Sequence, residues 1–211
     1  MLPYGRLKIA FVPVTAATRF DAIEKGEADL LCEPTSATLS RRQRVDFSIA
    51  TFVDGASLLI RSDGPRNFGG FAGKKIGVLG GTTTEAALRN SLKAANITAE
   101  IVPAKTHAEG LALLEGGKVA AYFADRSILL YLAAGAKAPK KLALAENHLT
   151  LEPYALALPR GDTDFRLAVD RALSRIYRSG EIAPIFIRSF GGKFEPTDIL
   201  ATLYLISGLP E

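Results

Sequence analysis

Residues 28–48, ADLLCEPTSATLSRRQRVDFS, bring together an apolar run, a proline, several hydroxyl side chains and an arginine. The apolar run at residues 28–32 predicts a strand covered on both faces, which Pro34 would end. Thr38 is the predicted N-cap of a helix whose first turn holds Arg41. The positive end of the helix dipole disfavours a cation at that position. Arg41 is therefore either a solvated side chain or a group held ready for an anion.

The same stretch resembles the signature of family 3 extracellular solute-binding proteins, the amino-acid receptors of ABC importers. The resemblance rests on Pro34, Ser36, Thr38, Arg41 and the VDFS of residues 45–48. It implies an α/β, two-lobed periplasmic binding protein type II architecture, each lobe a mixed or parallel sheet flanked by helices. It also implies that the Pro34 carbonyl and the Ser36 hydroxyl contact a bound amino acid, and that Arg41 clamps its α-carboxylate. Arginine suits this role because its planar fork can bond both carboxylate oxygens.

Composition limits the classes of protein that fit. A chain of 211 residues, 48% of them hydrophobic, can bury a core in one or two compact domains. No apolar run reaches the ~20 residues needed to cross a bilayer, and the first residues lack a signal-peptide pattern. The single cysteine, Cys32, excludes an internal disulfide and a cysteine-based metal site, and we expect it in the core. The net charge of +4 comes from scattered basic residues interleaved with acidic ones, so no nucleic-acid partner is expected.

Strand and helix patterns alternate along the chain, which predicts parallel sheets. The predicted strands are residues 7–14, 28–32, 56–61, 75–79, 99–102, 119–124 and 154–158. The predicted helices are residues 19–25, 85–95, 108–115, 127–134, 163–178 and 182–190, with a helical turn at 39–45.

The order of these elements predicts two lobes, the second inserted into the first. Lobe 1 is expected at residues 1–60 and 154–211, and lobe 2 at residues 61–153. The hinge crossings are expected near residues 56–61 and 154–158. In the solute-binding family the ligand lies in the cleft that these crossings define, and the lobes close over it.

The segment IGVLGGTTTE, residues 76–85, predicts a strand, a tight glycine turn and a helix start. Thr82 and Glu85 have the spacing of a capping box, and the backbone N–H groups of Thr83 and Thr84 would face an anion. From the residues alone, this turn is equally well a structural cap. The resemblance implies that it is the second half of the α-carboxylate site, formed by Thr82, Thr83 and Thr84.

Asp125 ends the apolar segment AAYFAD, residues 120–125, directly before a predicted helix. The residues alone allow an N-cap or a pair of acceptors for an α-ammonium group. The resemblance implies the second role, in which Asp125 and Arg41 together hold a zwitterion.

Two further segments resemble the glutamate/aspartate-binding subgroup: VPVTAATR at residues 12–19 and AKTHAEG at residues 104–110. The resemblance implies that Arg19 and His107 reach the distal carboxylate of the ligand. An acidic L-amino acid, glutamate or aspartate, is the expected ligand. From the residues alone, Arg19 is equally well a solvated helix residue and His107 an ordinary residue of a first helical turn.

The resemblance begins near residue 7, without a counterpart of the family's first strand and helix. We therefore expect an incomplete first lobe with uncovered strand edges and apolar surface. The chain would then be a truncated product, or a homo-oligomer in which a second copy supplies the cover by strand exchange.

The resemblance implies the substrate-binding component of an ABC importer, with a small-molecule amino acid and a transporter permease as its partners. The protein would meet the membrane only through the permease, and the resemblance implies a periplasmic location. We expect no enzyme activity, no cofactor and no metal. One rival is a cyclohexadienyl dehydratase-like enzyme, for which Glu33 is the candidate acid. Other rivals are a transcription-factor effector domain, which would need a preceding helix-turn-helix, and an oligomeric protein that has lost ligand binding.

Overall fold

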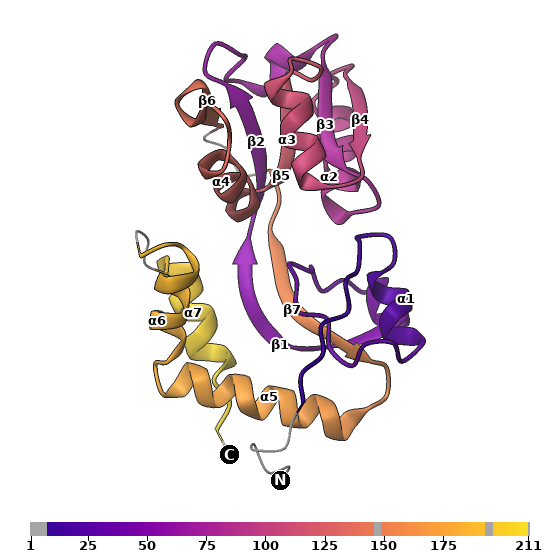
Figure 1. Cartoon of the computed structure of the whole chain (residues 1–211), viewed down its shortest axis with the longest axis vertical. Coiled ribbons are helices and arrows are strands. Elements are labelled where there is room, and N and C mark those ends of the chain that lie inside the picture. The colour runs from indigo at the N-terminus through magenta and orange to yellow at the C-terminus, as the bar shows by residue number, and fades with distance from the viewer. Residues whose placement is uncertain (1–7, 146–148, 193–195, 211) are drawn as a thin grey trace.

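The computed structural model describes residues 8–145, 149–192 and 196–210. It contains two lobes, each built around one sheet with helices packed against it (Figure 1). One sheet has five strands in the order β4-β3-β5-β2-β6, and the other pairs β1 with β7. We call them the five-stranded lobe and the two-stranded lobe. The predicted two-lobed α/β fold is confirmed.

The five-stranded lobe contains β2 (Ala56–Arg61), β3 (Lys75–Leu79), β4 (Glu100–Ala104), β5 (Ala121–Asp125) and β6 (Leu142–Leu144). Its helices are η3 (Phe68–Phe71), α2 (Thr83–Ala94), α3 (His107–Glu115), α4 (Arg126–Ala134) and η4 (Pro139–Lys141). β3 runs parallel to β4 and β5, whereas β2 runs antiparallel to β5 and β6. The sheet is therefore mixed.

Every residue of β5 is buried, because helices cover both faces of the sheet. Phe123 packs on one face with Leu88 of α2, and Tyr122 packs on the other with Leu114 of α3 and Leu129 of α4. Alternate residues of the strand thus serve two cores.

The two-stranded lobe contains β1 (Val45–Asp54) and β7 (Glu152–Pro159), which pair antiparallel. Its helices are α1 (Arg19–Glu24), η2 (Arg41–Gln43), α5 (Thr163–Arg178), α6 (Ile182–Ser189) and α7 (Asp198–Ser207). α5 and α7 contact β1, and α1 contacts β7. The sheet of this lobe is thus an antiparallel pair, where a mixed or parallel sheet was expected.

Two predicted strands of this lobe are wrong. Residues 8–14 form no strand, and Phe11 is 93% exposed; residue 7 lies outside the described residues. Residues 28–32 form only one isolated bridge, between Leu31 and Ala157, and Cys32 is exposed rather than in the core. An apolar run forms a strand only where a neighbouring strand completes its backbone hydrogen bonds. Within the described residues, neither run forms such a ladder with another strand.

Most other predictions agree with the structure. α5, β2 and β3 have the predicted bounds, and the remaining predicted helices and strands differ by a few residues at their ends. The helical turn predicted at 39–45 is the short helix η2. β1, β6 and α7 were not predicted.

Asp54 stands where the chain passes from one sheet to the other. Gly55 joins β1 to β2, and its N–H donates to Asp54 Oδ1 at 2.7 Å. Asp54 Oδ2 accepts from the Ser127 N–H at 3.0 Å and also from the Ser127 hydroxyl. The returning chain runs alongside, because Leu149 N–H donates to the Ala56 carbonyl at 2.8 Å. The bonds from Ser127 to Asp54 thus link the end of β1 to the start of α4.

Gly110 of α3 packs against Tyr122, and this contact predicts a sensitive position. A Cβ at Gly110 would lie 2.0 Å from Tyr122 Cε2. Because Tyr122 is fully buried, the ring has no room to move aside. We expect Gly110→Ala to lower the free energy of unfolding by about 3 kcal/mol, as overpacking does.

Urea denaturation followed by circular dichroism measures this change. Gly135→Ala is the matched control, because a Cβ there meets nothing nearer than 3.7 Å. Equal stability of Gly110→Ala and the unmodified protein would contradict the prediction.

Candidate functional site

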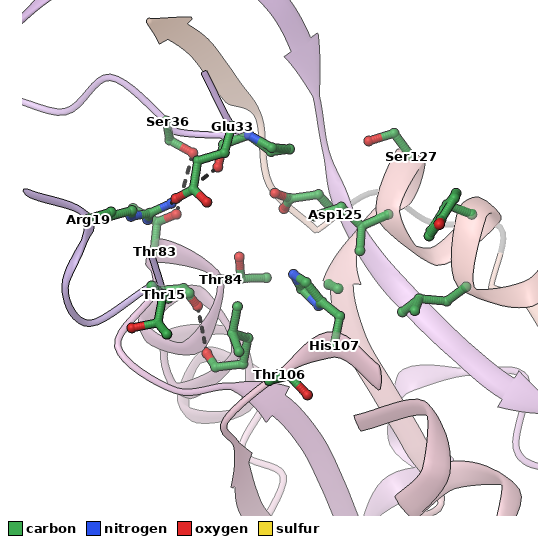
Figure 2. A pocket seen from close by; sticks show the side chains of 18 of the residues that line it. Thr15, Arg19, Glu33, Ser36, Thr83, Thr84, Thr106, His107, Asp125 and Ser127 are labelled. Atoms are coloured by element: carbon green, nitrogen blue, oxygen red, sulfur yellow. Dashed lines mark hydrogen bonds and ion pairs between the residues drawn. The ribbon is translucent and has the colours of Figure 1, made fainter. Parts of the chain in front are cut away.

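A cavity of about 610 Å³ lies between the lobes and is lined by residues of both (Figure 2). The structure brings all nine residues predicted for the ligand site to this cavity. They are Arg19, Pro34, Ser36, Arg41, Thr82, Thr83, Thr84, His107 and Asp125. Their contacts with a ligand remain a prediction.

The five-stranded lobe contributes residues from one edge of its sheet. β3, β4 and β5 are parallel, so their carboxyl ends meet at the same edge. Thr83 begins the helix after β3, His107 begins the helix after β4, and Asp125 ends β5. The fold therefore gathers two helix starts and a carboxylate at the cavity.

The predicted capping box at the start of α2 is present in a modified form. Thr82 Oγ1 accepts from the Glu85 N–H at 3.2 Å, but Glu85 Oε2 accepts from Gly81 rather than from Thr82. Gly81 has a φ of +74°, which glycine adopts without strain. By helix geometry the N–H groups of Thr83 and Thr84 lack an acceptor within the helix. Both residues line the cavity.

Arg41 is half-buried in the cavity wall. Its backbone N–H donates to Thr38 Oγ1 at 3.2 Å, and its Nη1 donates to the Ser36 carbonyl at 2.7 Å. Burial, aided by the positive charge of Arg19, lowers the pKa of Arg41 to about 10. A guanidinium partly stripped of water in this way gains from an incoming anion.

Asp125 is a buried carboxyl group with one free oxygen. It is 6% exposed, and the Tyr154 hydroxyl donates to its Oδ2. Oδ1 has no hydrogen-bond partner, and the side chain makes no capping bond to α4. Burial raises the pKa of Asp125 to about 6, although the bond from Tyr154 acts in the opposite direction. The side-chain N-cap is therefore not formed, and a buried acceptor is left without a donor.

Glu152, a residue that the sequence did not single out, joins the two lobes. It is buried, and its Oε2 accepts from the Ser36 hydroxyl and from the Thr83 hydroxyl, the latter at 3.2 Å. Ser36 belongs to the two-stranded lobe and Thr83 to the five-stranded lobe. Ser36 and Glu152 are 116 positions apart, so no local sequence signal could have linked them.

Arg19 is buried rather than solvated. It is 5% exposed, and its Nη1 donates to Glu33 Oε1 at 2.6 Å and to the Pro34 carbonyl at 3.3 Å. The carbonyl of Pro34, a predicted ligand contact, is therefore engaged by Arg19. Glu33, the candidate acid of the rival enzyme, is ion-paired.

His107 is the first residue of α3 and faces the cavity (Figure 2). Its Nδ1 lies 3.0 Å from the Tyr122 hydroxyl. Burial lowers the pKa of His107, and the negative charge of Glu33 only partly offsets this. The imidazole is therefore neutral at pH 7 and can either donate or accept a hydrogen bond.

Residues 8–145, 149–192 and 196–210 contain neither a candidate membrane-spanning helix nor a candidate metal cluster. No described helix is both long and apolar enough to cross a membrane. No three side chains among His, Cys, Asp and Glu in these ranges come together as a metal site.

The raised pKa of Asp125 predicts a pH effect on stability. The carboxyl group titrates at its ordinary value of 3.8 when unfolded and at about 6 when folded. Between these values the folded state keeps a proton that the unfolded state loses, so stability falls as the pH rises from about 4 to 6. Asp125→Asn cannot ionise. We expect it to be more stable than the unmodified protein at pH 7 by up to about 3 kcal/mol, at 1.36 kcal/mol per pKa unit.

Denaturant unfolding at pH 4 and pH 7 checks this expectation, with no amino acid present. The two proteins should converge at pH 4. Asp29→Asn, a change at an exposed aspartate, serves as the control. Its free energy of unfolding should equal that of the unmodified protein at both pH values. An Asp125→Asn protein that is less stable at pH 7 would show that the charged carboxylate is favoured in the fold.

Comparison with known proteins identifies several relatives. The chain is 30% identical over 191 residues to an L-glutamate/L-aspartate-binding protein of Pseudomonas aeruginosa, covering 90% of this chain and 63% of that protein. It is 27% identical over 194 residues to a glutamate/aspartate import solute-binding protein of Salmonella typhimurium, covering 92% and 64%. The chain thus spans less than two thirds of the length of these relatives.

Solved structures share the fold. An ABC transporter/periplasmic binding protein from Brucella ovis with glutathione bound aligns with a TM-score of 0.75 at 27% identity, over 81% of this chain and 56% of that one. An ancestral arginine-binding protein bound to glutamine aligns with a TM-score of 0.79 at 21% identity, over 89% and 81%. An ancestral amino acid-binding protein that is a precursor of cyclohexadienyl dehydratase aligns with a TM-score of 0.71 at 25% identity, over 82% and 73%.

The family model for bacterial extracellular solute-binding proteins, family 3, matches residues 4–192. This match covers most of the chain, and the two-lobed fold agrees with it. The chain belongs to the bacterial extracellular solute-binding proteins, family 3.

Proposed function

We propose that this chain binds an L-amino acid in the cavity between its lobes, as the substrate-binding component of an ABC importer. The observation that carries the proposal is the pairing of two opposite charges across one cavity. Arg41 comes from the two-stranded lobe, and Asp125, with its unbonded Oδ1, comes from the five-stranded lobe. A zwitterion carries the two complementary charges on one carbon atom. The binding functions of the Pseudomonas and Salmonella relatives support the proposal.

Arg41 would hold the α-carboxylate with help from hydroxyl groups around it. Ser36 and Thr83 meet there, with their Oγ atoms 3.4 Å apart, and would turn their hydroxyl protons from Glu152 to the ligand. Thr82 and Thr84 also line the cavity. The N-terminus of α2 adds its dipole, which favours an anion. Asp125 would accept the α-ammonium group through the oxygen that now lacks a donor.

Ligand binding would close the two lobes about Gly55 and the return crossing near residue 150. The lobe bounds of 1–60 with 154–211, and 61–153, remain a prediction. The closed form would be the one that a membrane permease recognises, in the periplasm. Homo-oligomerisation by strand exchange also remains a prediction.

The side chain of the ligand is a separate question. The Pseudomonas and Salmonella relatives are glutamate/aspartate-binding proteins, which supports an acidic ligand read through Arg19 and His107. That assignment needs Arg19 to be available to a second carboxylate. Its guanidinium is engaged by Glu33.

A cyclohexadienyl dehydratase-like enzyme is the second candidate, because one structural neighbour is a precursor of that enzyme. An acid-catalysed elimination needs a carboxylic acid with a proton to donate. Glu33, the candidate acid, already pairs with Arg19 at 2.6 Å. Incubation with prephenate or arogenate tests this alternative, and turnover would replace the binding proposal.

The proposal predicts a large loss of affinity in Arg41→Gln. The substitution keeps a hydrogen-bond donor but removes the charge partner of a buried carboxylate, which typically costs about 3–5 kcal/mol. We expect binding of every α-amino acid to weaken by at least about a hundredfold. Isothermal titration calorimetry with glutamate, aspartate, glutamine, asparagine and arginine measures it.

Arg42→Gln is the matched control, because Arg42 is the exposed neighbour on the same short helix. Its affinity should equal that of the unmodified protein. If Arg41→Gln binds the preferred amino acid as tightly as the unmodified chain, Arg41 is not the carboxylate site.

A further inference from the structure

Arg19 and Glu33 form an ion pair inside the wall of the cavity. Both residues line it, and Figure 2 shows the two side chains together on one side. Arg19 Nη1 lies 2.6 Å from Glu33 Oε1 and also donates to Thr35 Oγ1 at 3.3 Å. Arg19 is buried, with 5% of its surface exposed, whereas the Glu33 side chain is 32% exposed. The positive charge of Arg19 is thus balanced within the protein before any ligand enters.

The other charged groups around the cavity have their own assignments. Arg41 and Asp125 both line it and are the proposed partners for the two ends of a zwitterion. Glu152 accepts from Ser36 and Thr83. The remaining cation is Lys105, which is exposed. None of these offers a buried, unpaired cation to a ligand side chain.

An anionic and a cationic ligand side chain would therefore each be repelled by a like charge of the cavity wall. A second carboxylate near Arg19 would also lie near Glu33, and two like charges at short distance repel each other. A cationic side chain near Glu33 would approach both Arg19 and Arg41. An uncharged side chain avoids both penalties.

Hydrogen-bonding groups remain available for such a side chain. Glu33 offers carboxylate oxygens as acceptors, and His107, neutral at pH 7, lies on the opposite side of the cavity (Figure 2). Thr15 and Thr106 add hydroxyl groups to the cavity wall. A carboxamide carries N–H donors for Glu33 and a carbonyl oxygen for a hydroxyl or imidazole N–H, so it matches both sides.

We propose that Glu33 sets the side-chain selectivity of this site by neutralising Arg19, so that the bound amino acid has an uncharged carboxamide side chain. This inference rests on the proposed function, because it assumes that an α-amino acid enters the cavity. Glu33 is thus a specificity-determining residue, and glutamine or asparagine is preferred over glutamate, aspartate and lysine.

The test is calorimetric titration of the unmodified chain and of Glu33→Gln with glutamine, glutamate and lysine at pH 7. The unmodified chain should bind glutamine at least tenfold more tightly than glutamate. Glu33→Gln keeps the shape of the side chain but frees the charge of Arg19 for a ligand. It should shift the glutamine-to-glutamate affinity ratio at least tenfold towards glutamate.

Glu100→Gln is the matched control, because it removes a carboxylate from another ion pair, with Lys75 at 3.0 Å, away from the cavity lining. Its affinity ratio should equal that of the unmodified chain. The inference is overturned if the unmodified chain prefers glutamate or lysine, or if a folded Glu33→Gln protein keeps the original ratio. The preference of the unmodified chain decides the matter even if Glu33→Gln does not fold.

The outcomes also separate this inference from the proposed function. Tight binding of glutamate by the unmodified chain would overturn the role of Glu33 and support an amino-acid receptor. Absence of binding for every amino acid at millimolar concentration would overturn both.

Discussion

The hydrogen bonds of the Asp54 carboxylate connect the two lobes at the point where the chain crosses between them. One oxygen accepts from Gly55 and the other from Ser127, so a single side chain links the end of β1 to the first turn of α4. Asp125 lies two positions before Ser127, and Tyr154 of β7 donates to it. The position of the proposed ammonium contact relative to the two-stranded lobe therefore depends on this junction. A junction of short side chains around one glycine also restrains the lobes without fixing them through a large packed interface.

The cavity contains two charges that burial makes unfavourable. Asp125 is destabilised as a carboxylate, and Arg41 as a guanidinium, because neither is fully hydrated. Groups arranged in this way contribute to binding at the expense of folding, a trade that is common at functional sites. Arg19 and Glu33 show the opposite arrangement, in which each charge already has its partner. The site thus combines two charges that burial disfavours with two that form an ion pair.

Elements set by local signals could be predicted from the sequence, and those set by distant partners could not. The helix at 163–178 has a cap at Asp162 and a glycine with positive φ at Gly180, so residues close in sequence determine both of its ends. The run at 28–32 has strand composition but depends on a neighbour that it does not have. Within the site, the resemblance singled out nine residues that line one cavity. It could not supply Glu152, nor the pairing of Arg19, because these depend on side chains placed by the whole fold.

Cys32 precedes Glu33 and is the single cysteine of the chain. It is exposed, so a thiol-directed dye could be attached beside the cavity without introducing another cysteine. Partial burial raises the pKa of the thiol, so labelling should proceed faster in mildly alkaline buffer, where more thiolate is present. An environment-sensitive fluorophore at this position would turn the native chain into an optical sensor for the proposed amino-acid ligand.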